Sequence, residues 1–348
     1  MLSTTFTLLH VRGVFESLTY IACNHSRSSL KNYDEYPSHT NIIDCYTGKG
    51  VLHVLDVMTG HTRWRFETNG SPIVSSPAIS DDGTIYFGSW NQIFYAVDVS
   101  GNAKWEYKTD GAISASPLLL TRDMETHIYV GSGDRVMYKF DTNGRVVWKC
   151  KLGQAIYSSA AASSNGEILY VGSNDNRLYA IDTTTGKILW SQVLHGKVEA
   201  SPAVGSDGTI FVADFGGVVT AISRHGSIEW TYETPGRVSI VSSPTLDLED
   251  TVYIGSKTKQ VFAIRRDGTL KWSYSLDENV DSTLTLDRDG DLVFGGSKGG
   301  VYVLDSVTGK ARWSFNLKSP VFSTPVLCGH NMMVVASEKG NVIAIGGQ

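Results

Sequence analysis

The chain has 348 residues, of which 41% are hydrophobic, and a formal net charge of −5. This length allows one large domain or two ordinary ones, and either could bury a sizeable core. The acidic balance argues against a nucleic-acid partner, because proteins that neutralise a phosphate backbone are usually basic.

Residues 1–50 are predicted to be largely irregular, with the option that they supply two strands. Residues 1–23 end in Tyr20-Ile21-Ala22-Cys23, which is similar to the cleavage site of a bacterial lipoprotein signal. Arg12 and Glu16 interrupt the apolar run that such a signal needs, so we expect neither a signal peptide nor a lipidated Cys23. No stretch of about twenty apolar residues occurs, so no membrane-spanning helix is expected.

The rest of the chain consists of sequence repeats. Seven of the eight tryptophans follow a glycine by four residues, and successive members of this set are 40 to 43 residues apart. A four-stranded blade of a β-propeller has this length. The seven residues are Trp64, Trp105, Trp148, Trp190, Trp230, Trp272 and Trp313.

Each repeat has the composition of four short strands. Five of the seven repeats open with two small residues and a proline, such as Ser75-Ser76-Pro77, and the other two have alanine or leucine in place of the proline; we assign these segments to the first strand. Second and third strands, such as residues 84–89 and 178–182, are β-branched and aromatic runs, and a glycine turn then leads into the tryptophan strand. These runs are apolar on both faces, which indicates sheets that are covered on both sides.

The fold class is therefore predicted to be all-β, a propeller of seven four-stranded blades over residues 51–348. We expect the ring to close by pairing of the Trp64 strand with residues 332–345, which would remove the exposed sheet edges. The alternative is eight blades. In that case residues 1–50 supply two strands, residues 51–56 form a third, and the last blade lacks its outer strand.

The sequence Ala180–Trp190 (AIDTTTGKILW) resembles the tryptophan-docking motif of the pyrroloquinoline-quinone-like (PQQ-like) propeller family, and Val303–Trp313 is a second close match. The resemblance extends over residues 51–348. It implies that each of the seven tryptophans docks on the neighbouring blade and ties the ring together. None of these tryptophans is followed by aspartate, unlike the pattern of WD40 propellers.

The resemblance leaves two functional groups to compare. The enzymes of the family, quinoprotein dehydrogenases, carry two adjacent cysteines over the quinone, whereas Cys23, Cys45, Cys150 and Cys328 are scattered along this chain. The chain is more similar to the non-enzymatic group, which includes the outer-membrane assembly lipoprotein, sensor domains, and propellers fused to kinases or adenylating enzymes. We therefore expect a binding or scaffold propeller without catalysis, which recognises a protein, peptide or small ligand on its rim or central channel.

The alternative function is a PQQ-dependent dehydrogenase or a fragment of one. No cofactor is expected, since the site residues for PQQ are missing. Whether the chain belongs to a larger multidomain assembly stays open.

Two further motifs have ordinary structural explanations. Residues 287–291 (DRDGD) alternate carboxylates as a calcium loop does, but position twelve of that loop is Lys298, so we interpret the stretch as an acidic turn. Residues 295–300 (GGSKGG) lie between two strands, which indicates a turn and not a phosphate-binding loop. The nine histidines form no pair at ligand spacing, so no metal site is expected.

Differences between the repeats point to candidate binding residues. Two positions before the Ser or Thr of the first strand, the residue varies from repeat to repeat, while its neighbours stay small. The interpretation as a binding set selects Ser114, Tyr157, Glu199, Asp281 and Phe322, and packing between blades is the alternative. The loops after the tryptophan strands also differ between repeats. Their charged and polar residues are expected on a solvated rim of the ring. These residues are Asp110, Gln154, Lys197, Arg237, Asp277, Glu278 and Lys318.

Overall fold

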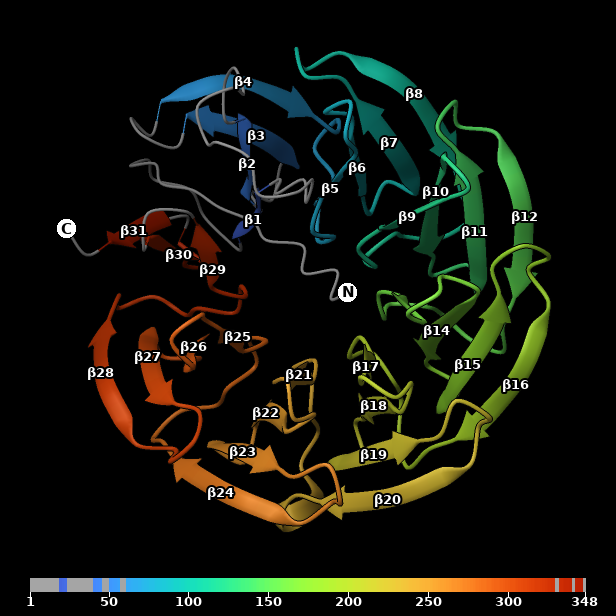
Figure 1. The fold of residues 1–348 in the computed structure, drawn as a ribbon. Helices are drawn as coiled ribbons and strands as arrows, with labels where there is room; N and C mark the ends of the chain where they lie inside the picture. Colours follow the sequence, from blue (N-terminus) through green and yellow to red (C-terminus); the bar gives the residue numbers. More distant parts are fainter. Residues whose placement is uncertain are drawn as a thin grey trace.

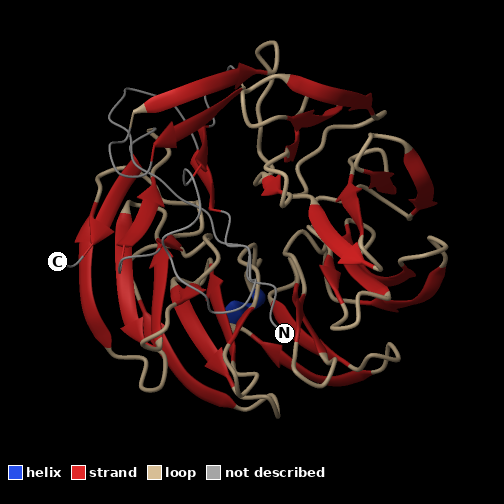
Figure 2. Ribbon diagram, turned by 45° about the horizontal axis from the view of Figure 1, so that its top comes forward, coloured by secondary structure: helices blue, strands red, loops and turns tan. Residues whose placement is uncertain are grey.

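The computed structural model describes residues 19–23, 40–45, 50–56, 61–328, 332–339 and 342–346. Its strands form eight antiparallel sheets, and each sheet is a meander of strands that are consecutive in the chain. Seven sheets have four strands, and the last has three. The sheets stand side by side around a common axis, with their first strands toward the axis and their fourth strands at the periphery (Figure 1, and tilted in Figure 2).

The strands fall into four sets according to their place in each sheet. The first strands are β1 (Thr19–Cys23), β5 (Ala78–Ile79), β9 (Leu118–Arg122), β13 (Ala161–Ala162), β17 (Ala203–Val204), β21 (Thr245–Leu246), β25 (Thr285–Leu286) and β29 (Val326–Cys328). The second strands are β2 (Thr40–Cys45), β6 (Ile85–Gly88), β10 (Glu125–Gly131), β14 (Ile168–Ser173), β18 (Ile210–Ala213), β22 (Val252–Ser256), β26 (Asp291–Gly295) and β30 (Met332–Ala336).

The outer half of each sheet carries the tryptophan motif. The third strands are β3 (Val51–Asp56), β7 (Ile93–Val97), β11 (Val136–Asp141), β15 (Arg177–Asp182), β19 (Val218–Ile222), β23 (Gln260–Ile264), β27 (Gly300–Asp305) and β31 (Val342–Gly346). The fourth strands are β4 (Thr62–Glu67), β8 (Ala103–Lys108), β12 (Val146–Lys151), β16 (Ile188–Val193), β20 (Ile228–Glu233), β24 (Leu270–Ser275) and β28 (Ala311–Asn316). A short 3₁₀ turn, η1 (Pro235–Arg237), follows β20.

The core lies between neighbouring sheets. Second and third strands such as β6 and β19 are buried throughout, because a sheet covers each of their faces. Fourth strands such as β8 alternate between exposed and half-buried residues. Aromatic rings fill the space between two sheets, as with Phe94 and Phe140, whose ring centroids lie 5.4 Å apart.

The structure corrects the expected count of seven sheets, since its described residues form eight. Strands β1, β2 and β3 precede the Trp64 strand and complete a sheet with it. The expected closure is also wrong. Strand β4 pairs with β3, whose apolar residues Leu52 and Val54 are fully buried, while β30 pairs with β29 and β31. One edge of β4 thus pairs within its own sheet, and the other edge pairs with neither β30 nor β31.

The small-small-proline segments lie immediately before the first strands and not within them. Ser75-Ser76-Pro77, for example, precedes β5. Proline has no N–H to give to a strand ladder, so these segments make their hydrogen bonds through side chains.

Candidate functional site

Hydroxyl groups link neighbouring sheets at the segments that precede the first strands. At five consecutive junctions the backbone N–H of the Ser position donates to the hydroxyl at the same position of the next sheet, over 2.9 to 3.1 Å. This hydroxyl chain runs through Ser76, Ser116, Ser159, Ser201, Ser243 and Thr283. It holds the segments next to one another, and therefore also the variable residues two positions earlier.

The residue just before each linking hydroxyl is serine or alanine in every repeat. The Ser75 hydroxyl donates to the Gly88 carbonyl over 3.0 Å and accepts from the Gly88 N–H over 2.8 Å. A Cβ on Gly88 would lie 2.1 Å from the side chain of Ile113 in the next sheet. This close packing requires small residues, which leaves the variable position as the one that can differ between sheets.

Three of the variable residues lie against turns of the preceding sheet. The Trp90 indole donates to the Ser114 hydroxyl over 3.0 Å, and the Asn174 amide donates to Glu199 over 3.1 Å. The Tyr157 ring packs over Gly133, where an added Cβ would lie 3.5 Å from it. Each partner comes from the turn between the second and third strands of the sheet before. Together these turns and the variable residues form one face of the ring, which we call the axial face.

Two exposed aromatic side chains belong to the axial face. Trp90 is 49% exposed and Tyr157 is 36% exposed. Trp90 follows Ser89, whose hydroxyl donates to the Pro72 carbonyl over 2.9 Å, so the turn that carries the indole is fixed by backbone and side chain. Trp90 is the eighth tryptophan, which lies outside the repeat, and the sequence analysis did not identify it as a binding residue. Its position 24 residues before Ser114, which equals the spacing of Gly133 and Tyr157, was the available signal.

Asp281 contributes a partly buried carboxyl group to the axial face. Burial raises the pKa of its carboxyl group, and the nearby charge of Lys257 partly offsets this effect. Its buried Oδ1 atom accepts no hydrogen bond from any described residue. Phe322, the last variable residue, is half-buried and follows the fully buried Val321.

A second group of unpartnered acceptors lies beside Glu199. Within the described part of the chain, the buried Oδ1 atoms of Asn174 and Asp175 accept no hydrogen bond. The other carboxylate oxygen of Asp175 accepts from the Tyr179 hydroxyl over 2.5 Å, so the side chain is held in place. Buried acceptors without donors are costly, and a ligand that supplies N–H or O–H groups would satisfy them.

The loops after the fourth strands differ in their exposure. Asp110, Gln154, Lys197, Arg237, Asp277 and Lys318 are exposed, as expected for a rim. Glu278 is only 2% exposed, which corrects its interpretation as a rim residue. Its carboxylate accepts from the Tyr302 hydroxyl over 2.6 Å and from the Lys298 N–H, so it fixes the turn at residues 296–299.

Buried Asp214 has a similar fixing role in another sheet. It is 1% exposed and accepts backbone N–H groups from His195 over 3.0 Å and from Gly216 over 2.7 Å. Burial raises the pKa of its carboxyl group against the effect of these hydrogen bonds. The carboxylate joins the loop at His195 to a turn of the axial face, which stiffens that face.

The repeated tryptophans contact the sheet that follows each of them. Six indole N–H groups donate to backbone carbonyls of the next sheet over 2.7 to 3.1 Å. The same rings lie against the motif glycines there, as Trp190 does at Gly226. For Trp313, the equivalent acceptor position in the last sheet lies outside the described residues.

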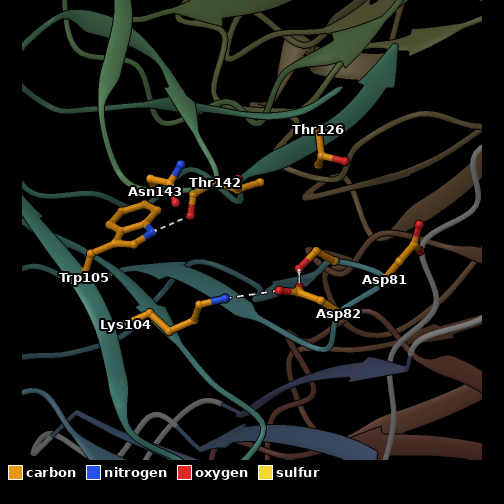
Figure 3. Close-up of a pocket in the computed structure, with 8 residues that line it drawn as sticks. Asp81, Asp82, Lys104, Trp105, Thr126, Thr142 and Asn143 are labelled. Atoms are coloured by element: carbon orange, nitrogen blue, oxygen red, sulfur yellow. Dashed lines mark hydrogen bonds and ion pairs between the residues drawn. The ribbon is translucent and has the colours of Figure 1, made fainter. Parts of the chain in front are cut away.

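A groove of about 540 Å³ lies away from the axial face, between the β5–β8 and β9–β12 sheets (Figure 3). Within the β5–β8 sheet, Lys104 Nζ donates to the Asp82 carboxylate over 3.1 Å and to the Thr84 hydroxyl over 2.8 Å. Partial burial opposes ionisation of Asp82, but hydrogen bonds from Ser80, Thr84 and Lys104 outweigh it and hold the pKa well below the ordinary value. Lys104 and Asp82 therefore satisfy each other, which makes the groove a weaker candidate than the axial face.

The described residues contain no group of three or more His, Cys, Asp or Glu side chains that could hold a metal ion. In the same part of the chain, no helix has the length and apolar character needed to cross a membrane. Residues 287–291 form a turn, in which Asp287 accepts from the backbone N–H groups of Asp289 and Asp291. The axial face thus offers hydrogen-bond acceptors and aromatic surface.

Comparison with known proteins places the chain in a family. Residues 120–348, more than half of the chain, match the family described as the β-propeller of the beta-alanine-activating enzyme. The chain belongs to this propeller family. Residues 48–162 of this family member also match the family of the outer membrane protein assembly factor BamB. The resemblance to PQQ-like propellers is thereby confirmed.

Similar proteins agree with this family at the level of the fold. BamB of Yersinia pestis is 31% identical over 74 residues, which are 21% of this chain and 19% of that protein. The match thus spans about a fifth of the length of that relative. The crystal structure of BamB from Moraxella catarrhalis superimposes with a TM-score of 0.71 at 20% identity, covering 88% of this chain and 93% of that one. The computationally designed Ika8 protein gives a TM-score of 0.77 at 15% identity, covering 98% and 100%.

Proposed function

We propose that the chain is an eight-bladed recognition propeller, which binds a protein or peptide on its axial face and catalyses no reaction itself. The observation that carries the proposal is the set of variable residues that the hydroxyl chain holds side by side on rigid segments. Rigid scaffolds that display different side chains at equivalent positions suit specific binding. The buried Oδ1 atoms of Asp281 and Asn174 accept no hydrogen bond from a described residue, which favours a ligand that brings hydrogen-bond donors.

The names of the similar proteins support this proposal. BamB is an assembly factor for outer membrane proteins, and the matching family is the propeller of an enzyme that activates beta-alanine. One name is that of an assembly factor, and the other is that of a propeller within an enzyme. We propose that this chain likewise serves a larger assembly by holding a partner protein, with its tryptophans as structural docking residues.

Binding should depend on the acidic residues of the axial face. A pull-down coupled to mass spectrometry identifies the partner, whose affinity for the purified chain is then measured by calorimetry. The double variant Glu199→Ala with Asp281→Ala is expected to bind at least about tenfold more weakly, since two acceptors are lost. Its unfolding temperature should stay close to that of the parent.

The matched control removes two exposed acidic residues from turns on the opposite face, Asp81→Ala with Asp289→Ala, and changes the net charge equally. This control should bind the partner with unchanged affinity. Equal loss in both double variants would show a general charge effect and contradict the site. An oxidation activity that appears when PQQ and calcium are added would contradict the non-catalytic part of the proposal.

The pH dependence of stability should show that the ionised carboxylate of Asp281 destabilises the folded chain. Its folded pKa is raised, so its contribution to stability is complete below the ordinary carboxyl pKa and is lost as the pH rises through the folded value. Asp281→Asn is therefore expected to unfold about 2 °C higher at neutral pH. At about pH 3 the two proteins should unfold together. A lower unfolding temperature for Asp281→Asn at neutral pH would contradict this assignment.

A further inference from the structure

Strand β16 differs from the other outer strands in its exposed side chains. Ile188, Leu189 and Val193 are 44%, 50% and 52% exposed, whereas each of the other described fourth strands has no more than one exposed large hydrophobic side chain. Strand β16 is also the only described fourth strand that contains no Asp, Glu, Lys or Arg. Charged side chains are a common protection of edge strands against pairing with other chains, and β16 lacks this protection.

The outer edge of β16 carries backbone groups without a strand partner. Among the described strands β16 pairs with β15 alone, and it lies on the outer border of the ring (Figure 1). The Leu194 N–H donates to the Asn176 carbonyl over 2.8 Å. Because an antiparallel ladder alternates, the N–H and C=O groups of Ser191 and Val193 therefore point away from β15. The Gln192 side-chain amide donates to the Val193 carbonyl over 3.0 Å, as expected for a carbonyl that faces outward.

A second copy of this chain is the occupant that fits this edge. Two identical strands can pair antiparallel about a two-fold axis, and each then supplies the donors and acceptors that the other needs. The contact buries apolar and uncharged polar side chains of β16, so no charged group of the strand loses its water. The Gln192 amide both donates and accepts, so it can form a hydrogen bond with its own copy.

The regular part of β16 sets the register. The ladder with β15 shifts between Ala180 and Ile181, which leaves Leu189 in a bulge, and it is regular from Trp190 onward. We propose that two copies of the chain pair through β16, with the two-fold axis at Gln192. Ser191 then lies opposite Val193 of the other copy, and each such pair exchanges two backbone hydrogen bonds. The dimer joins the two β13–β16 sheets into one continuous sheet.

The neighbourhood of β16 is compatible with this contact. Arg177 of β15 donates to the Ser191 hydroxyl over 3.0 Å, so its charge stays one strand behind the edge. The paired segment is short, and small interfaces are usually weak, so the dimer is expected at micromolar or higher concentrations. The proposal does not depend on the ligand of the axial face, because β16 lies at the periphery.

Sedimentation velocity of the full chain tests the dimer over a series from about 1 μM to about 1 mM. Val193→Glu is expected to raise the dissociation constant of the dimer at least about tenfold, because it buries a charge in the contact. The fold should accept this change, since Glu67 and Glu233 hold the same position in β4 and β20. The matched control Leu270→Glu adds the same charge at an exposed apolar residue of β24 and should dimerise like the parent.

A second substitution tests the register. Ser191→Lys combined with Val193→Glu places opposite charges across the two-fold axis, so this double variant is expected to dimerise as well as the parent or better. A parent chain that stays monomeric throughout the series would overturn the proposal and leave β16 to a strand of another protein. Equal weakening by Val193→Glu and Leu270→Glu, or no recovery in the double variant, would overturn it as well.

Amide hydrogen exchange shows whether the contact is a strand ladder. The Ser191 and Val193 amides are expected to exchange at least about tenfold more slowly in concentrated than in dilute parent protein, because dimerisation gives them acceptors. Ser273 and Ser275 of β24, which hold the same positions, should exchange equally at both concentrations. A dimer in which the β16 amides keep their exchange rates would contradict pairing through this edge.

Discussion

Replacing Trp190 with alanine is expected to lower the free energy of unfolding by about 3–5 kcal/mol, the range for truncation of a large aromatic residue in a core. The indole bridges two sheets. Its N–H donates to the Arg224 carbonyl over 3.1 Å, and its ring lies against Gly226 and 5.8 Å from the Tyr170 ring. Truncation removes the ring contacts and leaves the carbonyl without this donor.

Chemical denaturation of the purified chain measures this loss, and Trp90→Ala is the control. Trp90 is 49% exposed and lies outside the repeat, so its truncation should cost no more than about 1 kcal/mol. If both variants unfold at nearly the parent denaturant concentration, the proposed docking role of the repeated tryptophans is wrong.

Gly226→Ala is expected to destabilise the chain by about 2–4 kcal/mol for two separable reasons. The backbone of Gly226 has φ = +91°, a conformation that costs an L residue about 1–2 kcal/mol. A Cβ there would also lie 2.8 Å from the Trp190 ring, and overpacking of this kind adds a penalty of about 1–3 kcal/mol. The second penalty exists only while the indole is present.

A double-mutant cycle separates the two causes. In the Trp190→Ala background, Gly226→Ala should cost only the backbone part, about 1–2 kcal/mol, so the two changes are expected to be non-additive. Gly166→Ala is a matched control, because Gly166 has φ = +69° and no atom within 4 Å of its added Cβ. Strict additivity of Trp190→Ala and Gly226→Ala would show that ring and glycine are not in contact.

The propeller fold could be predicted because it depends on repeated, local signals. The spacing of the tryptophans and the doubly apolar strands follow directly from sheets that stack face to face. The number of sheets could not be settled in the same way. Strands β1 and β2 carry no tryptophan motif, although residues 51–56, which form β3, have the sequence pattern of a third strand.

The candidate site was predictable only in part. Comparison of the repeats identified Ser114, Tyr157, Glu199, Asp281 and Phe322 as positions that differ, because packing constrains their neighbours to small residues. The partners of Ser114, Tyr157 and Glu199 come from turns of the preceding sheet, 24 or 25 residues earlier, and no local pattern links the two segments. The burial of Glu278 was equally hidden, since a loop position gives no sign that a carboxylate turns inward.

The hydroxyl chain around the axis has a direction. At each described link the amide of one sheet gives its hydrogen to the side chain of the sheet that follows, from Ser76 onward to Thr283. Loss of the Ser201 hydroxyl would therefore deprive Ser159 of an acceptor and leave the bond from Ser201 to Ser243 in place. At these links the amide of each sheet therefore depends on a hydroxyl group of the next sheet. Loss of that hydroxyl group removes a hydrogen-bond acceptor from the sheet that precedes it in the chain.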